Sequence, residues 1–433
     1  MLIRRAVLLD GRTVDLRLGT RIDDMAAVLS PRRGEAVFDA QGGTVLPGLH
    51  DHHLHLRSAA AALRSVHVGP DAVRGHAHLA EVLRASAPGT DGWIRAIGYH
   101  ESVAGALNRD ILDTICPTVP VRIQHRSGVL WTLNSAGLAL IGLGDHADGR
   151  VRSADPRLSS ALTRNDIGLG ELSAQLAGYG VTGVTDATPD LDPADIAALD
   201  DAHRRGELAQ SVHCLAPGKR ILHDDDLDVD ALASWIGERH EGGDPVALHC
   251  VTAVQLVAAL AALASAGRYP GDRIEHGAVV PDATIPALVA SKATVVTQPN
   301  FVGERGDHYL QDIPAEEHHE LWRVASLRDA GVPLALSTDA PFGQADPWAA
   351  MRAAVSRRTR SGVVLGADEA VEPSAALTMF LGEPERPATV RRIERGAPGD
   401  VCVLSVPPLQ ALADLDAQMV AATVIGGRVM FQR

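Results

Sequence analysis

VLPGLHDHHLHL, residues 45–56, places four histidines and one aspartate in a short stretch that begins with apolar residues. The apolar start predicts a β-strand, in which successive side chains point to opposite faces. On such a strand Asp51, His53 and His55 share one face, and the other two histidines share the opposite face. Two imidazoles at positions i and i+2 can hold a single metal ion. We therefore predict His53 and His55 as metal ligands and expect the other two histidines to pack.

From about residue 171 onward, short β-rich runs alternate with helical stretches rich in alanine and leucine. This alternation predicts βα units and a parallel sheet, and the strands are apolar on consecutive positions, as expected when both faces are covered. The strand-like runs are VTGVTDA, SVHCLAPGKRIL, PVALHCV, RIEHGAVV, ATVVTQPNF and PLALSTDA. A chain of 433 residues is long enough for an α/β (β/α)8 TIM barrel of roughly 250 residues or more with an accessory module.

The two ends of the chain lack this alternation. Residues 1–44 and 392–433 contain short strands and turns without helices between them, which predicts one small β-sandwich module built from both termini. Residues 45–391 are then the barrel. The rhythm is blurred between residues 57 and 165, and this stretch is too long for two βα units, so we expect part of it to be an insertion that caps the barrel.

Composition and charge exclude several classes of partner. The formal net charge is −14 and no run of Lys or Arg forms a basic stripe, which argues against nucleic acid and anionic membranes. No 18 apolar residues run together, and the N-terminal MLIRRAVLLDGRTV is typical of a strand rather than a signal peptide. Four cysteines lie far apart without a CxxC pair, which indicates reduced thiols in a cytoplasmic protein. A homodimer that acts on a small molecule is a fair expectation.

Three further candidate ligands end predicted strands. His249 ends PVALH, His276 ends RIEH, and Asp339 ends PLALSTD, at spacings of about one and two βα units. The carboxyl ends of the strands form the face at which TIM barrels keep their active sites. A lone histidine at a strand end is more often structural, but three such residues in phase with an HxH strand point to one metal site.

Lys219 is chemically distinctive because only two of the 40 basic residues are lysines, the other being Lys292. It precedes His249 by about one βα unit. An amine can take up carbon dioxide to form a carbamate, an anion that can bridge two metal ions, whereas a guanidinium cannot. The alternative is a solvated lysine beside the acidic residues 224–226.

Several motifs of the chain resemble one superfamily. VLPGLHDHHLH matches the pattern PGxxDxHxH, WTLNSAGL resembles a Trp-x-x-Asn-Ser-x-x-Leu segment, and RIEHGAVV and TQPNF resemble a sixth and a seventh barrel strand. STDAPFG resembles a turn that carries an aspartate, and IERGAPGDVCVLS resembles the returning strand of a terminal β module. Together they resemble a metal-dependent hydrolase of the amidohydrolase superfamily, in the branch of N-substituted formamide deformylases and D-aminoacylases.

The resemblance implies a (β/α)8 barrel, a hydrolytic reaction and a binuclear site with two zinc ions. By position, His53, His55 and Asp339 would bind the more buried ion. His249 and His276 would bind the more exposed one. A carboxylated Lys219 would bridge the two ions.

The predicted chemistry is hydrolysis of a C–N bond in an amide-like substrate, an N-acyl or N-formyl amine. Imidazole and carboxylate ligands suit zinc, and two ions that share a hydroxide give a nucleophile at neutral pH. Asp339 is the expected catalytic residue, a general base toward the hydroxide and then a general acid toward the leaving nitrogen. The expected substrate contacts are His125, Trp131, Gln298, Asn300 and Arg305.

Two alternatives remain open at this point. A mononuclear aminohydrolase that deaminates a heterocyclic amine would use the same histidines and aspartate but no carboxylated lysine, so Lys219 discriminates between the two enzymes. A non-catalytic barrel would be expected to have lost ligands, whereas all six ligand positions are filled.

Overall fold

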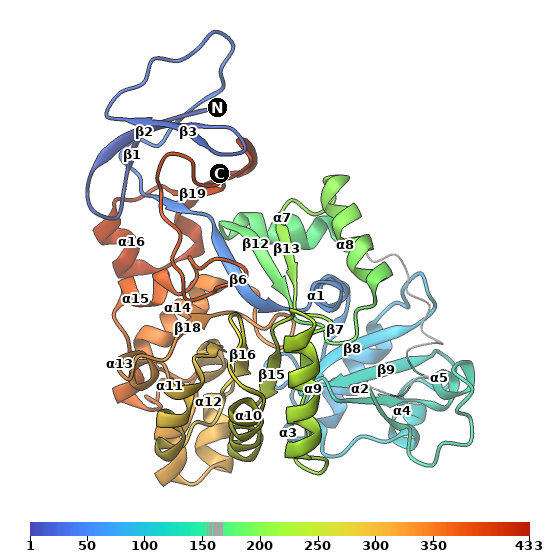
Figure 1. Ribbon diagram of the computed structural model, residues 1–433. Coiled ribbons are helices and arrows are strands. Elements are labelled where there is room, and N and C mark those ends of the chain that lie inside the picture. The colour runs from blue at the N-terminus through green and yellow to red at the C-terminus, as the bar shows by residue number, and fades with distance from the viewer. Residues whose placement is uncertain (154, 156–157, 159–167) are drawn as a thin grey trace. The chain divides into compact units, whose positions relative to one another are not determined.

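The structure is a computed structural model that describes residues 1–153, 155, 158 and 168–433 (Figure 1). It consists of two compact units, one formed by Met1–Leu56 with Leu169–Arg433 and the other by Arg57–Gly168. Both contain helices and strands, in agreement with the predicted α/β class. Within the described ranges, no helix has both the length and the apolar character needed to cross a membrane.

Eight parallel strands form the centre of the first unit. They are arranged in two sheets, with the orders β13-β12-β6 and β14-β15-β16-β17-β18. Strand β6 also lies beside β18. Past the end of β18, the amide of Asp339 donates to the carbonyl of His53 in β6 at 2.9 Å. The strands are β6 (Leu49–Leu54), β12 (Val181–Asp186), β13 (Ser211–Cys214), β14 (Lys219–Ile221), β15 (Ala247–Cys250), β16 (Arg273–His276), β17 (Thr294–Thr297) and β18 (Leu334–Leu336).

The adjacency of β6 and β18 is the one that a barrel requires between its first and last strands. Among the described residues the strands pair as two separate sheets, so the closed (β/α)8 barrel stays a prediction. The run SVHCLAPGKRIL, which the sequence predicted as one strand, is split into β13 and β14. The split falls at Pro217 and Gly218. Pro217 has no amide to donate to the hydrogen-bond ladder of a sheet. Gly218 has no room for a side chain, because a Cβ there would lie 2.3 Å from the carbonyl oxygen of Pro245.

Helices alternate with these strands, as the sequence predicted from residue 171 onward. Helix α10 packs against α9 and against β15, and Figure 1 shows both helices in front of that strand. Capping boxes at Asp192 and Thr252 satisfy the first amides of α8 and α10. The helices are α7 (Gly170–Gly178), α8 (Pro193–Arg204), α9 (Val229–Glu241), α10 (Ala253–Ala266), α11 (Ile285–Ser291), α12 (Asn300–Asp312), α13 (Ala325–Asp329), α14 (Pro347–Ser356), α15 (Pro373–Thr378) and α16 (Pro408–Asp414).

The two ends of the chain meet in two further sheets of the first unit, with the orders β3-β2-β1-β4 and β21-β20-β19-β5. One cluster of buried apolar residues, including Ile3, Leu16, Val403 and Val424, joins them. Strand β5 pairs with β19, although the predicted module ended at residue 44. Classification as a β-sandwich stays a prediction. The strands are β1 (Leu2–Val7), β2 (Thr13–Leu18), β3 (Ile22–Ala26), β4 (Val37–Asp39), β5 (Val45–Pro47), β19 (Val401–Leu404), β20 (Val420–Ile425) and β21 (Arg428–Gln432).

The second unit contains a five-stranded sheet with the order β11-β10-β9-β8-β7. Its strands are β7 (Val66–His67), β8 (Ile94–Tyr99), β9 (Val121–His125), β10 (Leu130–Leu133) and β11 (Arg150–Arg152). Among the described residues its helices are α2 (Gly75–Ala85), α3 (Glu101–Ala104), α4 (Arg109–Ile115) and α5 (Ser135–Leu140), and α1 (Leu56–Leu63) leads into it. The insertion predicted within residues 57–165 falls in this unit, except that residues 154, 156–157 and 159–165 lie outside the described residues. Its role as a cap stays a prediction.

Candidate metal centre

The six predicted ligands come from five strands of the first unit. His53 and His55 stand at the end of β6, His249 and His276 stand in the last two positions of β15 and β16, and Asp339 follows β18. Lys219 differs from these residues because it is the first residue of β14, level with Ala247. Its long side chain nevertheless brings Nζ to 3.1 Å from His53 Nε2.

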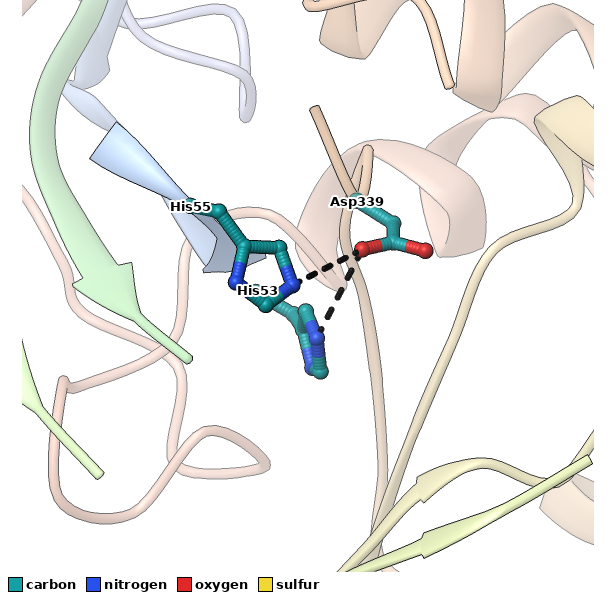
Figure 2. Close-up of side chains that lie close together, drawn as sticks. All are labelled: His53, His55 and Asp339. Carbon is teal, nitrogen blue, oxygen red and sulfur yellow. Dashed lines mark ion pairs between the residues drawn. The ribbon is translucent and has the colours of Figure 1, made fainter. Parts of the chain in front are cut away.

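His53, His55 and Asp339 form the tightest group, and Figure 2 shows both imidazoles facing one carboxylate oxygen. Asp339 Oδ1 lies 3.6 Å from His53 Nε2 and 3.5 Å from His55 Nε2. The same oxygen is buried and has no hydrogen-bond partner among the described residues. Ligands around a tetrahedral ion with bonds of roughly 2.1 Å lie about 3.4 Å apart. The three residues therefore fit a divalent metal ion.

The other predicted ligands lie beside this group. The ring centroid of His276 lies 4.7 Å from that of His53 and 4.5 Å from that of His249, and its Nδ1 lies 4.0 Å from Asp339 Oδ2. With Lys219 Nζ against His53, the structure brings all six predicted residues together. Four imidazoles, one amine and one carboxylate thus meet at the carboxyl ends of the strands.

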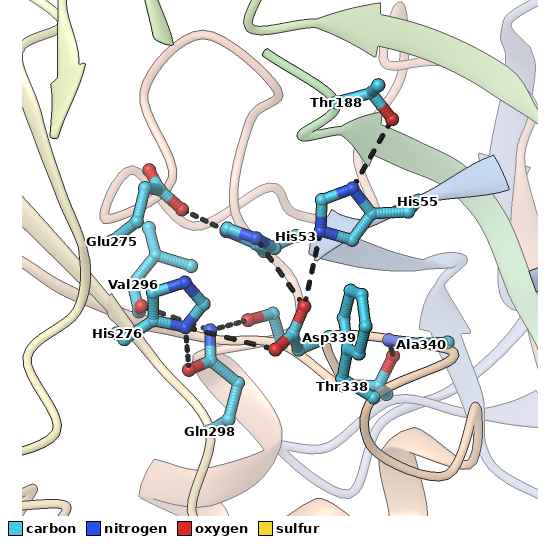
Figure 3. Close-up of polar contacts among 12 residues, drawn as sticks. His53, His55, Thr188, Glu275, His276, Val296, Gln298, Thr338, Asp339 and Ala340 are labelled. Carbon is cyan, nitrogen blue, oxygen red and sulfur yellow. Dashed lines mark hydrogen bonds and ion pairs between the residues drawn. The ribbon is translucent and has the colours of Figure 1, made fainter. Parts of the chain in front are cut away.

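Hydrogen bonds at Nδ1 fix the imidazole rings, as Figure 3 shows. His53 Nδ1 bonds to Glu275 Oε2, His55 Nδ1 lies 3.3 Å from Thr188 Oγ1, and His276 Nδ1 lies 2.8 Å from Gln298 Oε1. An acceptor at Nδ1 keeps the proton of the neutral ring there and leaves Nε2 free to bind a metal. His53 and His55 are therefore oriented as ligands by their neighbours.

Glu275 is a residue of the site that the sequence analysis missed. Regular alternation along β16 would point Glu275 and His276 to opposite faces, yet both reach His53. His276 adopts a left-handed φ of 71° and Gly277 follows with a φ of 53°, so the chain turns at this point. Arg273 donates to Glu275 at 2.6 and 3.1 Å. Arg273 and Glu275 carry opposite charges in one buried strand, and buried charges need partners. This pattern in RIEH is the signal that could have indicated the pair from the sequence.

Burial sets the charge state of the predicted ligands. It lowers the pKa values of His53 and His276 well below 6.5 and lowers that of His249 to about 3, so these rings are neutral, the form that binds metal. Burial also lowers the pKa of Lys219 to about 8, against the opposing effect of Glu275 and other carboxylates. A larger share of neutral amine is consequently available at Lys219 than at an exposed lysine.

Asp51 connects β6 to the turn that carries Asp339. Its carboxylate accepts hydrogen bonds from the Thr338 amide at 3.1 Å, from the Thr338 hydroxyl and from the His53 amide at 3.3 Å. Burial raises the pKa of Asp51 to about 7. His50 and His52 are fully buried, in agreement with the prediction that they pack.

Three predicted substrate contacts have structural partners in the first unit. Gln298 is fully buried, and its amide bonds to His276 and to Ser337 Oγ at 2.9 Å. Asn300 Nδ2 donates to the Thr338 carbonyl at 3.1 Å, and Arg305 Nη2 donates to the Phe342 carbonyl at 2.6 Å. Whether any of them also touches a substrate stays a prediction.

Residues 303–309, which include Arg305, lie within α12. Pro299, with a φ of −64°, leads directly into the first turn of this helix, and Glu304 and Arg305 favour helix.

The two remaining predicted contacts belong to the second unit. His125 Nε2 lies 3.1 Å from Glu101 Oε2. Trp131 is 7% exposed, and the guanidinium groups of Arg95 and Arg122 lie 5.4 and 5.6 Å from the centroid of its ring. These contacts give Trp131 a packing role within its own unit.

Comparison with known proteins identifies the family. A family model described as the amidohydrolase family matches residues 36–431. A relative from Arthrobacter pascens, an N-substituted formamide deformylase, is 25% identical, and the alignment covers 99% of this chain and 95% of the relative.

Solved structures share the fold. An uncharacterized metal-dependent hydrolase from Pyrococcus horikoshii OT3 has a TM-score of 0.74 at 18% identity over 94% of this chain and 98% of its own. A second such hydrolase, from Pyrococcus furiosus, has a TM-score of 0.69 at 19% identity over 94% and 99%. These likenesses give a TIM-barrel-type α/β fold. Since the family model spans nearly the whole chain, this protein belongs to the amidohydrolase family and is a metal-dependent hydrolase of C–N bonds.

Proposed function

We propose that the protein hydrolyses the C–N bond of an N-formyl or N-acyl amine at a site for two zinc ions. The observation that carries this proposal is the buried, unpartnered Asp339 Oδ1 that faces His53 and His55, with the amine of Lys219 at 3.1 Å from His53 Nε2. The formamide deformylase named above, which matches along nearly the whole chain, supports the choice of amide.

Six residues would hold the two ions. Bound zinc supplies a hydroxide nucleophile at neutral pH and polarises the substrate carbonyl. The bridging ligand would be Lys219 after carboxylation, in which the neutral Nζ adds to the carbon of carbon dioxide and releases one proton to solvent. The lowered pKa of Lys219, about 8, favours this step because only the neutral amine reacts. The ligands are His53, His55, Lys219, His249, His276 and Asp339.

Asp339 would move the proton. Its carboxylate would accept a proton from the attacking water and return it to the leaving nitrogen, so that an amine and a carboxylic acid are released. A positioned general acid or base contributes typically about 10²–10⁴-fold to a rate. The Asp51–Thr338 hydrogen bonds hold the residue before Asp339 and thereby keep its carboxylate aimed at the two imidazoles.

The finer architecture is part of the same proposal. We expect the eight strands to close as a (β/α)8 barrel within residues 45–391, which the adjacency of β6 and β18 supports. The shared apolar cluster supports a β-sandwich module from residues 1–44 and 392–433. The four cysteines are free thiols, which supports a cytoplasmic location. A homodimer remains an expectation.

Metal stoichiometry is the first test. Elemental analysis of protein purified without chelator should give about two divalent ions per chain, and a screen of N-formyl and N-acyl amines should then reveal hydrolysis. About one ion per chain, with release of ammonia from a heterocyclic amine, would support the mononuclear aminohydrolase instead. A chain that refuses added zinc would overturn both proposals.

The two lysines provide a matched test of the bridging ligand. Lys219→Arg keeps a cation but cannot form a carbamate, so it should lose about one ion per chain and most activity. Lys292→Arg, at an exposed residue that follows α11, should behave like the unchanged protein. Equal metal content in both variants would contradict the carboxylated lysine.

A further inference from the structure

The chain that follows His276 is paired with residues 320–322 of the same unit. The amide of Trp322 donates to the carbonyl of Ala278 at 2.9 Å, and the amide of Val280 donates back at 2.9 Å to the carbonyl two residues before Trp322. The two bonds form an isolated antiparallel bridge. Residues 320–322 therefore fix the backbone directly after this predicted metal ligand.

Both sides of the bridge contain a residue with an unusual backbone conformation. His276 has a φ of 71° and Trp322 a φ of 51°, and each lies in the left-handed region. That region is unfavourable for residues with a side chain, and a bulky residue in it is a true outlier. Such conformations persist only where the surrounding structure imposes them.

Arg357 supplies the contacts that impose the conformation of Trp322. The side chain of Arg357 is fully buried. Its Nη1 donates to the Trp322 carbonyl at 2.7 Å, its Nη2 to the Leu321 carbonyl at 2.8 Å and its Nε to the Leu365 carbonyl at 3.1 Å. Because the backbone turns at Trp322, the successive carbonyls of Leu321 and Trp322 both reach one guanidinium.

The surroundings of Arg357 indicate that it does more than fill space. The three carbonyls that it binds belong to residues of one buried apolar cluster, Leu321, Trp322 and Leu365. A cation is costly to bury in such surroundings, and an apolar side chain would serve packing alone. The planar fork of donors accounts for an arginine here, because it can hold several backbone acceptors in one geometry.

We propose that Arg357 is a positioning residue for His276, an inference that rests on the metal site of the proposed function. By holding residues 320–322, Arg357 maintains the backbone turn at His276. This turn keeps the ring of His276 within 4.7 Å of that of His53 and 4.5 Å of that of His249, measured between centroids. Gln298 orients the same ring through Nδ1 at 2.8 Å (Figure 3).

Arg391 provides a matched control in the same unit. Its Nε donates to the carbonyls of Leu381 and Gly382 at 3.3 and 2.8 Å, and its Nη2 donates to the Gly48 carbonyl at 2.6 Å. Burial lowers the pKa of Arg357 and that of Arg391 to about 10, so both stay charged at neutral pH. Gly48 precedes β6, at the end of that strand opposite to the predicted ligands.

The first test measures zinc affinity by competition with a chromophoric chelator in the unchanged chain, Arg357→Lys and Arg391→Lys. Lysine keeps the charge but not the planar fork of donors. In Arg357→Lys the affinity for the more weakly bound zinc ion should fall about tenfold, while the affinity for the other ion stays the same. Arg391→Lys should bind both ions like the unchanged chain, although urea unfolding shows a similar loss of stability in the two variants.

Hydrogen exchange of the unchanged protein tests the same link without a variant. Coupling is reciprocal, so if residues 320–322 position His276, zinc binding should stabilise their bridge in return. Zinc should slow the exchange of the Val280 and Trp322 amides about tenfold. The amide of Arg391, which donates to the Leu381 carbonyl at 2.8 Å, should exchange at the same rate with and without zinc.

Three results would overturn the positioning role of Arg357. They are an unchanged zinc affinity in Arg357→Lys, an equal loss of affinity in Arg391→Lys, and exchange of the Val280 and Trp322 amides that zinc does not alter. A chain that takes up no zinc in any form would refute the proposed metal site, and this inference with it. Uptake of zinc by the unchanged protein therefore separates a failure of the proposed function from a failure of this inference alone.

Discussion

His53 is the most constrained residue of the candidate metal centre. Its Nδ1 bonds to Glu275, its Nε2 faces Lys219 and Asp339, and its side chain is fully buried. Arg273 compensates the charge of Glu275 within the same strand. The carboxylate therefore holds the ring in one orientation before any ion arrives, and the cost of ordering the ligand is met on folding.

Glu275→Gln should lower metal affinity about 10–100-fold, because an amide is a weaker acceptor for His53 and leaves Arg273 without its ion pair. Chelator competition measures the affinity. The control is Glu369→Gln, which removes another buried carboxylate that pairs with Arg323 at 2.9 Å. It should reduce stability but not metal affinity. Equal affinity in Glu275→Gln and the unchanged protein would contradict the role of Glu275.

Asp339→Asn should reduce kcat by about 10²–10⁴-fold and weaken metal binding, because the amide neither accepts the proton nor ligates as an anion. Steady-state kinetics and elemental analysis measure the two effects. Asp346→Asn is the matched control. Asp346 caps the start of α14 by accepting a hydrogen bond from the Trp348 amide. Asparagine caps a helix as well as aspartate does. Full metal content together with full turnover in Asp339→Asn would refute the proposed mechanism.

At the scale of the elements, helix α12 holds the loop that carries Asp339. Asn300 donates to the Thr338 carbonyl, Arg305 donates to the Phe342 carbonyl, and Glu304 Oε1 accepts from the Gln344 amide at 3.0 Å. The loop needs such support because Asp339 itself has a φ of 57°, a left-handed conformation that costs a non-glycine residue about 1–2 kcal/mol.

Glu304→Ala should lower kcat/KM about tenfold, because the Gln344 amide and Asn300 lose their acceptor and Asp339 is held less accurately. Asp307→Ala is the control on the same helix. Its carboxylate also accepts from a backbone amide, that of Ser361, but at an exposed position. It should change kcat/KM less than twofold. Similar losses in both variants would indicate a general effect on α12.

At the scale of the whole molecule, we expect the acid stability of the first unit to depend on neutral histidines such as the half-buried His213. Burial and the nearby Arg273 lower the pKa of His213 below 6.5. The unfolded chain therefore binds more protons than the folded chain below pH 6.5. The stability that the neutral ring contributes is complete above that pH and is lost as the pH falls toward the lowered pKa.

His213→Gln should flatten this pH dependence. The free energy of unfolding of the unchanged protein should fall by at most about 1.4 kcal/mol per pH unit below pH 6.5 because of this residue. Urea unfolding on both sides of pH 6.5 measures the slope. His319→Gln removes a histidine whose side chain is 53% exposed and should leave the slope unchanged. A variant His213→Gln with the original slope would show that other groups control acid stability.

Local sequence patterns were sufficient to predict the candidate ligands that the structure brings together. Alternation along one strand distinguishes His53 and His55 from His50 and His52, and the strand ends bring in Asp339. These predictions depend only on the two-residue period of a strand and on the common direction of parallel strands. The same periodicity predicted the α/β class and the run of strands and helices after residue 171.

Only the tertiary structure decided which neighbours orient these residues. Glu275 reaches His53 because the backbone turns at His276, and Gln298 bonds to His276 instead of standing free at a strand end. The use of α12 to hold the Asp339 loop has the same origin. A left-handed φ and a hydrogen bond between residues far apart in the chain leave no periodic trace in the sequence, since both arise from how separate segments pack against each other.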